Sequence, residues 1–395
     1  MSLEHAVMSR KHVVLIAGAG GMGSAVGLLL RELGDFEVDL FVGDADARRA
    51  QTAASWIREG STRKGAVEPF LLPPEGSSPA FQRALESAEI LLDCLPGREA
   101  PRMAQHARRH RLHYANLTEY VRESEEVREI AGGAEEGFVL QTGLAPGFVD
   151  VLAHGLFQRF CQEYGVVDVD LVAMRVGALS TTARPPHYYG FTWSSIGVAT
   201  EYVEPATVIR DFRRTTRPSL TDVEPILIRG VLYEEALTSG GAADLPTALE
   251  GRVRNLDYKT LRYPGHYGWV RSVLDEAPVG SDRAQYLLRK MEETVPFVED
   301  DLVAIYAAVE GKAADGTLKR LEDARLIHPS RVGARMLKAI QATTAAGLAE
   351  SARLLLNGEL RGGVFLQSQI DPPHFMVGPF ISTIYGPADA RSYAT

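Results

Sequence analysis

Ten consecutive residues, 257–266, carry the side chains of this chain that are best suited to chemistry. The segment has the sequence DYKTLRYPGH and holds two cations, one imidazole and two phenols. Arginine offers a planar pair of donors to a carboxylate, and a lysine ammonium can be tuned for proton transfer. The segment therefore predicts a site for a small anionic substrate. A charged surface turn that ends at Pro264 and Gly265 would explain the same residue types.

Three residues of this segment are the candidate catalytic groups, namely Lys259, Arg262 and His266. We expect Arg262 to bind a substrate carboxylate. His266 or Lys259 could be the base, because imidazole titrates near neutral pH and burial or a neighbouring cation lowers the pKa of lysine. In an extended strand Lys259 and Arg262 face opposite sides, so they could share one substrate only where the strand bends towards Pro264. A structural ion pair is the alternative for each cation.

A glycine-rich loop near the N-terminus predicts a dinucleotide site. It follows an apolar run at residues 12–17, which is typical of a buried parallel strand, and it precedes a helix predicted over residues 24–33. The glycines of G-x-G-x-x-G allow a tight turn, a close approach of the pyrophosphate, and close packing of helix on strand. The cofactor-binding residues expected here are Gly18, Ala19, Gly20, Gly21, Met22 and Gly23.

An acidic residue after the second predicted strand indicates which cofactor binds. Asp44 ends the run at residues 38–43 and follows Gly23 by 21 positions, which is the spacing of a carboxylate that binds the adenosine ribose diol. A carboxylate there would repel the 2'-phosphate of NADP, so NAD is the predicted cofactor. Arg48 and Arg49 could accept a 2'-phosphate, which keeps NADP as the less favoured alternative.

Further predicted strands at residues 89–95, 113–117 and 138–142 should end at the same edge of a parallel sheet, where ligands bind. The turn at residues 143–150 would then lie near the nicotinamide, although a plain turn into the helix predicted over residues 148–160 also explains its proline and glycine. From these strand ends we expect Cys94, Leu95 and Pro96 beside the cofactor, and Asn116 and Asp150 in the substrate pocket.

The second half of the chain changes to alternating apolar and polar residues, as at 167–176, which indicates an antiparallel sheet. A hairpin is predicted at residues 311–316 and a long helix over residues 332–356, whereas the tail after Gly363 has no predicted structure. An aromatic cluster begins at residue 188, and two of its members, Tyr189 and Trp193, could wall the substrate pocket or belong to a core or a dimer surface.

These patterns predict an α/β Rossmann domain with an inserted α+β domain that contains a mixed, largely antiparallel sheet. The Rossmann domain is expected to be discontinuous, over residues 1–165 and 331–395, with the α+β substrate and dimerisation domain over residues 166–330.

Composition narrows the class of protein. The chain has 395 residues, a formal charge of -9, 45% hydrophobic and 24% charged residues, and no apolar run of membrane-spanning length. The acidic balance argues against nucleic acid and anionic membranes as partners. Cys94 and Cys161 lack the spacing of a metal or redox pair, so no metal site is expected. With a polar start that has no secretory pattern, the expected location is the cytoplasm.

Five segments together resemble the saccharopine dehydrogenase family: the glycine loop and residues 143–147, 192–194, 201–202 and 258–266. The resemblance extends from about Val13 to about Glu359, and within the family it is nearest to the lysine 6-dehydrogenases. It implies a homodimer formed through the second sheet and NAD(P)-linked oxidation of a carbon that bears nitrogen. The reaction it first suggests is oxidative deamination of the side-chain amine of L-lysine to the semialdehyde.

Two departures from the family pattern keep alternatives open. Asp150 stands where the resemblance leads us to expect Asn, and Asn116 stands where an Asp is common. Saccharopine dehydrogenase or carboxynorspermidine dehydrogenase, which act on larger secondary amines, are the rival enzymes. An NAD-binding sensor or scaffold without catalysis is the rival from another class.

Overall fold

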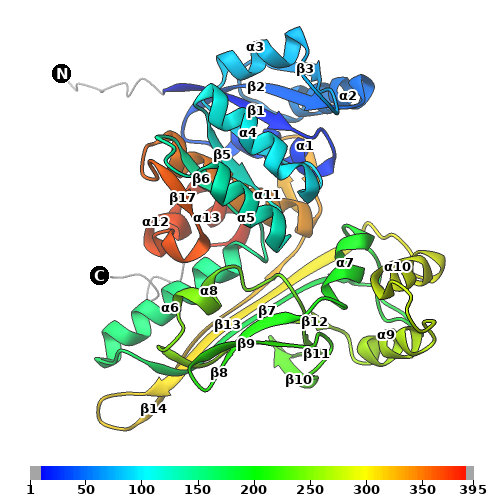
Figure 1. Ribbon diagram of the computed structural model, residues 1–395, viewed down its shortest axis with the longest axis vertical. Coiled ribbons are helices and arrows are strands. Elements are labelled where there is room, and N and C mark those ends of the chain that lie inside the picture. The colour runs from blue at the N-terminus through cyan, green and yellow to red at the C-terminus, as the bar shows by residue number, and fades with distance from the viewer. Residues whose placement is uncertain (1–9, 388–395) are drawn as a thin grey trace.

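The computed structural model describes residues 10–387 and contains two large sheets, one in each half of the molecule (Figure 1). The first sheet has seven strands in the order β17-β6-β5-β4-β1-β2-β3, and every pairing is parallel. Strands buried on both faces require apolar side chains throughout, and Val14, Leu15 and Ile16 are accordingly 0% exposed. The strands are β1 (Lys11–Ala17), β2 (Glu37–Asp44), β3 (Val67–Leu71), β4 (Ile90–Asp93), β5 (His113–Asn116), β6 (Gly137–Val139) and β17 (Gly363–Phe365).

Helices cover both faces of this sheet and bury their apolar sides on it (Figure 1). The helices on one face are α1 (Gly21–Leu33), α2 (Ala47–Gly60) and α11 (Ala339–Leu356), and those on the other are α3 (Pro79–Ser87), α4 (Ala100–His110) and α5 (Val121–Ile130). This doubly wound arrangement places the carboxyl ends of β1, β4, β5 and β6 at one edge, where ligands bind in such sheets.

The second sheet runs in the order β10-β11-β12-β7-β13-β14, with β8 on β12 and β9 on β8. Only β12 and β7 pair in parallel, so the sheet is mixed and largely antiparallel, which confirms the predicted fold class. Its strands are β7 (Val169–Ser180), β8 (Ala206–Arg210), β9 (Arg213–Arg217), β10 (Glu224–Ile228), β11 (Val231–Leu237), β12 (Val253–Arg262), β13 (Asp301–Lys312) and β14 (Leu318–Ile327).

Helices at the ends of the second sheet complete its core. These are α7 (Ser195–Glu201), α8 (Leu245–Ala248), α9 (His266–Asp275) and α10 (Arg283–Thr294). The predicted hairpin after β13 is confirmed, since Lys312 pairs with Leu318 across its turn. Helix α6 (Phe148–Tyr164) connects the two sheets and packs on β7 and β13.

The helix predicted over residues 332–356 begins later than expected, at Ala339. The residues before it form a small hairpin of β15 (Ser330–Val332) and β16 (Arg335–Leu337). Val332 and Leu337 are each 1% exposed, so the apolar residues that suggested a longer helix are buried as hairpin side chains.

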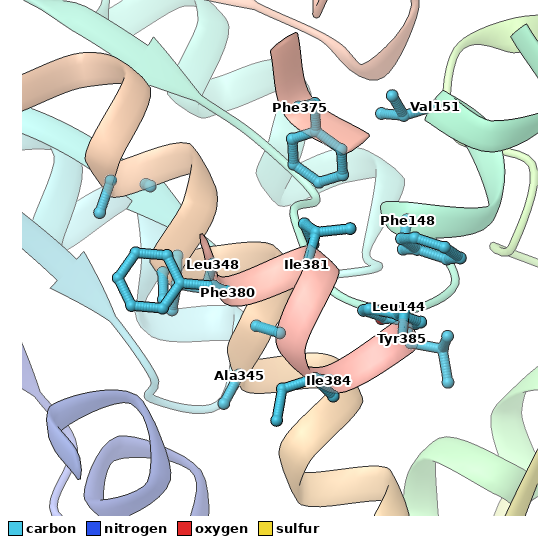
Figure 2. Close-up of a cluster of buried hydrophobic side chains, with 14 of the residues drawn as sticks. Leu144, Phe148, Val151, Ala345, Leu348, Phe375, Phe380, Ile381, Ile384 and Tyr385 are labelled. Atoms are coloured by element: carbon cyan, nitrogen blue, oxygen red, sulfur yellow. The ribbon is translucent and has the colours of Figure 1, made fainter. Parts of the chain in front are cut away.

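The C-terminal segment, which the sequence left unassigned, completes the first half of the molecule. Strand β17 pairs with β6, and helices α12 (Pro372–Val377) and α13 (Pro379–Tyr385) pack against α6 and α11 (Figure 2). Tyr385 stacks on Phe148 with ring centroids 3.6 Å apart. Within residues 10–387, no helix is long and apolar enough to cross a bilayer, and no cluster of side chains is arranged to hold a metal ion.

Candidate active site

A cavity of about 470 Å³ lies where the carboxyl edge of the first sheet meets the second sheet. Loops after β4, β5 and β6 line one side, and β7, β12 and α7 line the other. Of the residues predicted for the site, those that line this cavity are Met22, Cys94, Leu95, Pro96, Trp193 and Arg262.

The glycine loop forms the turn between β1 and α1. Gly18 has φ 101°, and a Cβ there would lie 2.8 Å from the carbonyl oxygen of Cys94; a Cβ on Gly23 would lie 1.9 Å from the carbonyl oxygen of Gly18. In the described part of the chain, nothing lies within 4 Å of the corresponding position on Gly20, and no side chain caps the start of α1. The free N–H groups of this helix start and the open face at Gly20 fit a pyrophosphate.

The carboxylate of Asp44 lies directly beside this loop. Its Oδ2 accepts a hydrogen bond from the Ala19 amide at 3.0 Å, and its Oδ1 accepts one from the Asp46 amide at 3.0 Å. Asp44 thus lies next to the pyrophosphate cradle, as a ligand of the ribose diol should. From the sequence, Arg49 was either solvated or a ligand of a 2'-phosphate. In the structure its Nη1 lies 3.6 Å from Asp44 Oδ1.

Buried polar groups hold the strand ends in place. Asp93 accepts hydrogen bonds from the Leu95 amide at 3.0 Å and the Tyr114 hydroxyl at 2.9 Å, and burial raises its pKa to about 7. Asn116 donates to the Tyr114 hydroxyl at 3.3 Å and accepts from the Gln141 amide at 3.0 Å. Asn116 is 1% exposed and does not line the cavity, so its amide fixes β5 against the next loop instead of meeting a substrate.

Asp150 is also a structural residue in this fold. It is 0% exposed, and its Oδ2 accepts a hydrogen bond from the Gly147 amide at 2.8 Å across the turn into α6. Burial raises the pKa of Asp150 well above its ordinary value. Both departures from the family pattern therefore lie behind the cavity wall, and the structure does not bring Asn116 or Asp150 into the cavity lining, where the sequence placed them.

The pleat of β12 separates the two cations of the 257–266 segment. The strand is continuous from Val253 to Arg262, so Tyr258, Thr260 and Arg262 face the cavity and Lys259 faces away. Lys259 Nζ lies 2.7 Å from a Glu224 oxygen and 2.8 Å from a Glu235 oxygen. The structure does not bring Lys259 to the site.

Arg262 is held at the cavity by a fixed set of partners and is 1% exposed. Its Nη2 donates to Glu201 at 3.0 Å and its Nε donates to the Tyr202 hydroxyl at 2.6 Å. The guanidinium carbon lies 4.8 Å from the ring centre of Tyr189, a distance at which the aromatic face attracts a cation. Tyr189 therefore lies behind Arg262 and supports it, instead of walling the cavity as expected.

His266 belongs to the same buried network and does not line the cavity. It is 0% exposed; its Nδ1 donates to the His187 carbonyl at 2.6 Å, and its Nε2 accepts from the Tyr202 hydroxyl at 3.0 Å. Burial and the positive charge of Arg262 lower its pKa to about 3. A neutral imidazole with both nitrogens engaged is a poor general base, so the geometry assigns His266 to orienting Tyr202 and, through it, Arg262.

Two carboxylates that were not among the predicted site residues line the cavity. Glu119 follows β5, where Thr118 Oγ1 accepts a hydrogen bond from the Tyr120 amide at 3.3 Å, and Glu201 ends α7. Burial raises the pKa of Glu119 to about 7; burial also raises that of Glu201 to about 8, with Arg262 opposing the shift and Glu119 adding to it.

The position of Glu119 could have indicated its role, because it follows the end of a predicted parallel strand by two residues. For Glu201, the only signal in the sequence was the family resemblance of residues 201–202. Among residues 10–387, the carboxylate of Glu119 receives no hydrogen bond, whereas one oxygen of Glu201 is held by Arg262. Glu119 thus has both oxygens available for a ligand.

Comparison with known proteins gives two family matches and a set of similar folds. The saccharopine dehydrogenase NADP binding domain matches residues 14–140, and the saccharopine dehydrogenase C-terminal domain matches residues 143–384. The first match confirms that the glycine loop belongs to an NAD(P)-binding domain.

Two solved structures share the whole architecture. Apo saccharopine dehydrogenase (L-Glu forming) from Saccharomyces cerevisiae has a TM-score of 0.70 at 15% identity, covering 95% of this chain and 98% of that chain. The homospermidine synthase from Legionella pneumophila in complex with NAD has a TM-score of 0.65 at 12% identity, covering 96% of this chain and 91% of that chain. At these identities the likeness concerns the fold.

Proposed function

The chain belongs to the saccharopine dehydrogenase family, and we propose that it is an NAD-dependent oxidoreductase that oxidises the CH–NH unit of an amine substrate. The observation that carries the proposal is the pair of carboxylates, Glu119 and Glu201, in the cavity between the cofactor loops and the second sheet. Carboxylates in a site with low water content bind ammonium groups and can also accept their protons.

The glycine loop would bind the pyrophosphate of the cofactor, and Asp44 would bind its adenosine ribose diol. When NAD is bound, its nicotinamide supplies the hydride acceptor. The loop at Cys94–Pro96 and the turn around Pro146 line the same cavity as the two carboxylates. The protein's own part is therefore to hold the amine carbon against this edge and to remove a proton from nitrogen.

Deprotonation has to precede hydride loss, because an ammonium with a pKa near ~10.4 has no lone pair to support it. Glu119 is our assignment for the base, since its oxygens receive no hydrogen bond from residues 10–387 and its pKa of about 7 suits proton transfer at neutral pH. Glu201 remains paired with Arg262 and would bind the ammonium without losing that partner.

L-Lysine is the first candidate substrate. Three N–H groups of Arg262 donate to the Tyr202 hydroxyl, the Leu261 carbonyl and the Glu201 carboxylate. Its two other N–H groups can bind one substrate carboxylate. Arg262 is the only cation among the residues that line the cavity within the described part of the chain. Saccharopine and similar adducts carry more carboxylates than this single guanidinium can neutralise, so they are the less favoured alternative.

NADH formation from a panel of amines tests the proposal. We expect NADH from lysine with NAD, at a rate that rises with pH through about 7 because the base must be ionised. Glu119→Gln should lower kcat by roughly 10²- to 10⁴-fold and abolish this rise, while Glu125→Gln, on the exposed face of α5, should leave both unchanged. The absence of NADH formation with any amine, in a protein that binds NAD, would overturn the proposed function.

A further inference from the structure

A second cavity, of about 540 Å³, adjoins the first and shares Glu119, Tyr120 and Glu201 with it. We propose that this second cavity is a subsite for a distal ammonium group, so that the preferred ligand is an extended aliphatic amine with at least two positive charges. The inference rests on the proposed function, because it takes the reacting nitrogen to lie near Glu119 and Glu201.

The charge of the second cavity selects for cations. Four carboxylates line it, and among the described residues Arg122 is its only cation. The remaining polar lining consists largely of hydroxyl groups, which can accept hydrogen bonds from an ammonium. The carboxylates are Glu119, Glu123, Glu201 and Glu204. An anionic tail would be repelled here, whereas an ammonium would regain the interactions that it loses on leaving water.

Glu119 lines both cavities. Gly197 and Gly240 lie beside it: a Cβ on Gly197 would lie 2.5 Å from the Trp193 ring and 3.4 Å from Glu119 Oε1, and one on Gly240 would lie 3.8 Å from Glu119 Cβ. A carboxylate with no hydrogen bond from residues 10–387 therefore stands where the two spaces join, as a ligand spanning both would require.

The wall beside the junction is fixed. Thr238 lines the second cavity and Thr260 lines the first, and their hydroxyl oxygens lie 2.6 Å apart. Both residues are 2% exposed. The far end of the second cavity reaches the surface, where Glu204 is exposed and Glu123 is partly exposed. In the proposed binding mode, a linear ligand runs from the first cavity past Glu119 towards these outer carboxylates.

The test measures binding, so that it does not depend on turnover. Calorimetry in the presence of saturating NADH, which cannot accept a hydride, compares a linear triamine with a monoamine that has the same first alkyl segment. We expect the triamine to bind more tightly to the wild-type protein. The double variant Glu123→Gln/Glu204→Gln should weaken triamine binding by roughly three- to tenfold, which corresponds to two partly exposed ion pairs, and should change monoamine binding by less than about twofold.

Glu125→Gln, which removes a carboxylate of α5 that does not line either cavity, is the matched control and should change neither affinity. Equal affinities of the wild-type protein for the two amines, or equal weakening of both by the double variant, would overturn the subsite. Selective triamine binding without any NADH formation would support the subsite and count against the proposed function. The outcomes that overturn the subsite therefore differ from the outcome that overturns the proposed function.

Discussion

At the scale of single residues, a buried chain of hydrogen bonds fixes the cation of the site. Arg262 donates to the Tyr202 hydroxyl, Tyr202 donates to His266 Nε2, and His266 Nδ1 donates to the His187 carbonyl. This direction of donation requires a neutral imidazole, in agreement with the lowering of the His266 pKa to about 3. The imidazole that suggested a general base in the sequence thus orients an arginine in the structure.

Asp44 gives a prediction about cofactor choice at the same scale. Asp44→Asn should keep the hydrogen bond from the Ala19 amide but lose the charge that repels a 2'-phosphate and that pairs with Arg49. The ratio of kcat/KM for NADP to that for NAD should rise by about tenfold or more, since one favourable charge interaction is worth about 1.4 kcal/mol. Steady-state kinetics with both cofactors measures this ratio.

Asp46→Asn is the matched control for this prediction. Asp46 caps α2 through hydrogen bonds from the Arg48 and Arg49 amides, and asparagine caps equally well. The cofactor ratio should therefore stay at the wild-type value. An unchanged ratio in Asp44→Asn as well would mean that Asp44 does not decide between the cofactors.

At the scale of elements, the pleat of β12 gives its two cations different tasks. Lys259 joins a buried ion network on the face away from the cavity, where Arg175 Nε also lies 2.6 Å from a Glu235 oxygen. Arg262, three residues further along, faces the cavity. An odd spacing on a strand guarantees such a separation, whatever the two side chains are.

Lys259→Met should therefore act on stability and not on catalysis. It leaves the buried Glu235 with Arg175 alone, and removing one partner from a buried ion pair costs about 3 kcal/mol. Urea denaturation measures the change in the free energy of unfolding, and kcat/KM per folded enzyme should change by less than about twofold.

Lys290→Met, which removes an exposed partner of Glu293 on α10, should change the unfolding free energy by no more than about 0.5 kcal/mol. A large loss of kcat in Lys259→Met at wild-type stability would return Lys259 to the catalytic residues.

At the scale of the whole molecule, the C-terminal helices close the first half around α11 (Figure 2). Glu350 on α11 is 0% exposed, and its oxygens accept hydrogen bonds from Arg353 at 3.2 Å and from the Phe380 amide at 3.3 Å. Burial raises the pKa of Glu350 to about 7. The carboxyl group therefore connects α11 to α13 in a manner that depends on pH.

The folded-state pKa of Glu350 lies above its unfolded value, so ionisation costs stability as the pH rises from about 4.5 to about 7. Glu350→Gln cannot ionise and avoids this cost. Relative to the wild-type protein, the variant should gain roughly 2–3 kcal/mol of unfolding free energy between about pH 5 and pH 8. Urea denaturation at several pH values measures the difference.

Glu126→Gln, an exposed change on α5, should show a stability difference that is flat with pH. If the Glu350→Gln difference is also flat, the Glu350 carboxyl ionises as it would in water. Because both comparisons subtract the wild-type curve, the other buried carboxyl groups of the protein cancel.

Features that depend on residues close together in the chain could be predicted from the sequence. A strand, a glycine loop and a helix are contiguous in the chain, so their order, the place of Asp44 and the identity of the first domain follow from spacing. Alternation in the second half likewise predicted a largely antiparallel sheet. The cations at Lys259 and Arg262 had to face opposite sides of any straight strand, and that too is a local property.

Which side chains share the cavity depends on how distant segments of the chain pack together. Glu119 and Glu201 are far apart in the sequence and meet because a loop of the first sheet faces a helix of the second. Burial, which no local pattern measures, then moved the pKa of His266 down to about 3 and those of Glu119 and Glu201 up to about 7 and about 8. Desolvation depends on everything packed around a group, so the choice between base and support was made by the fold.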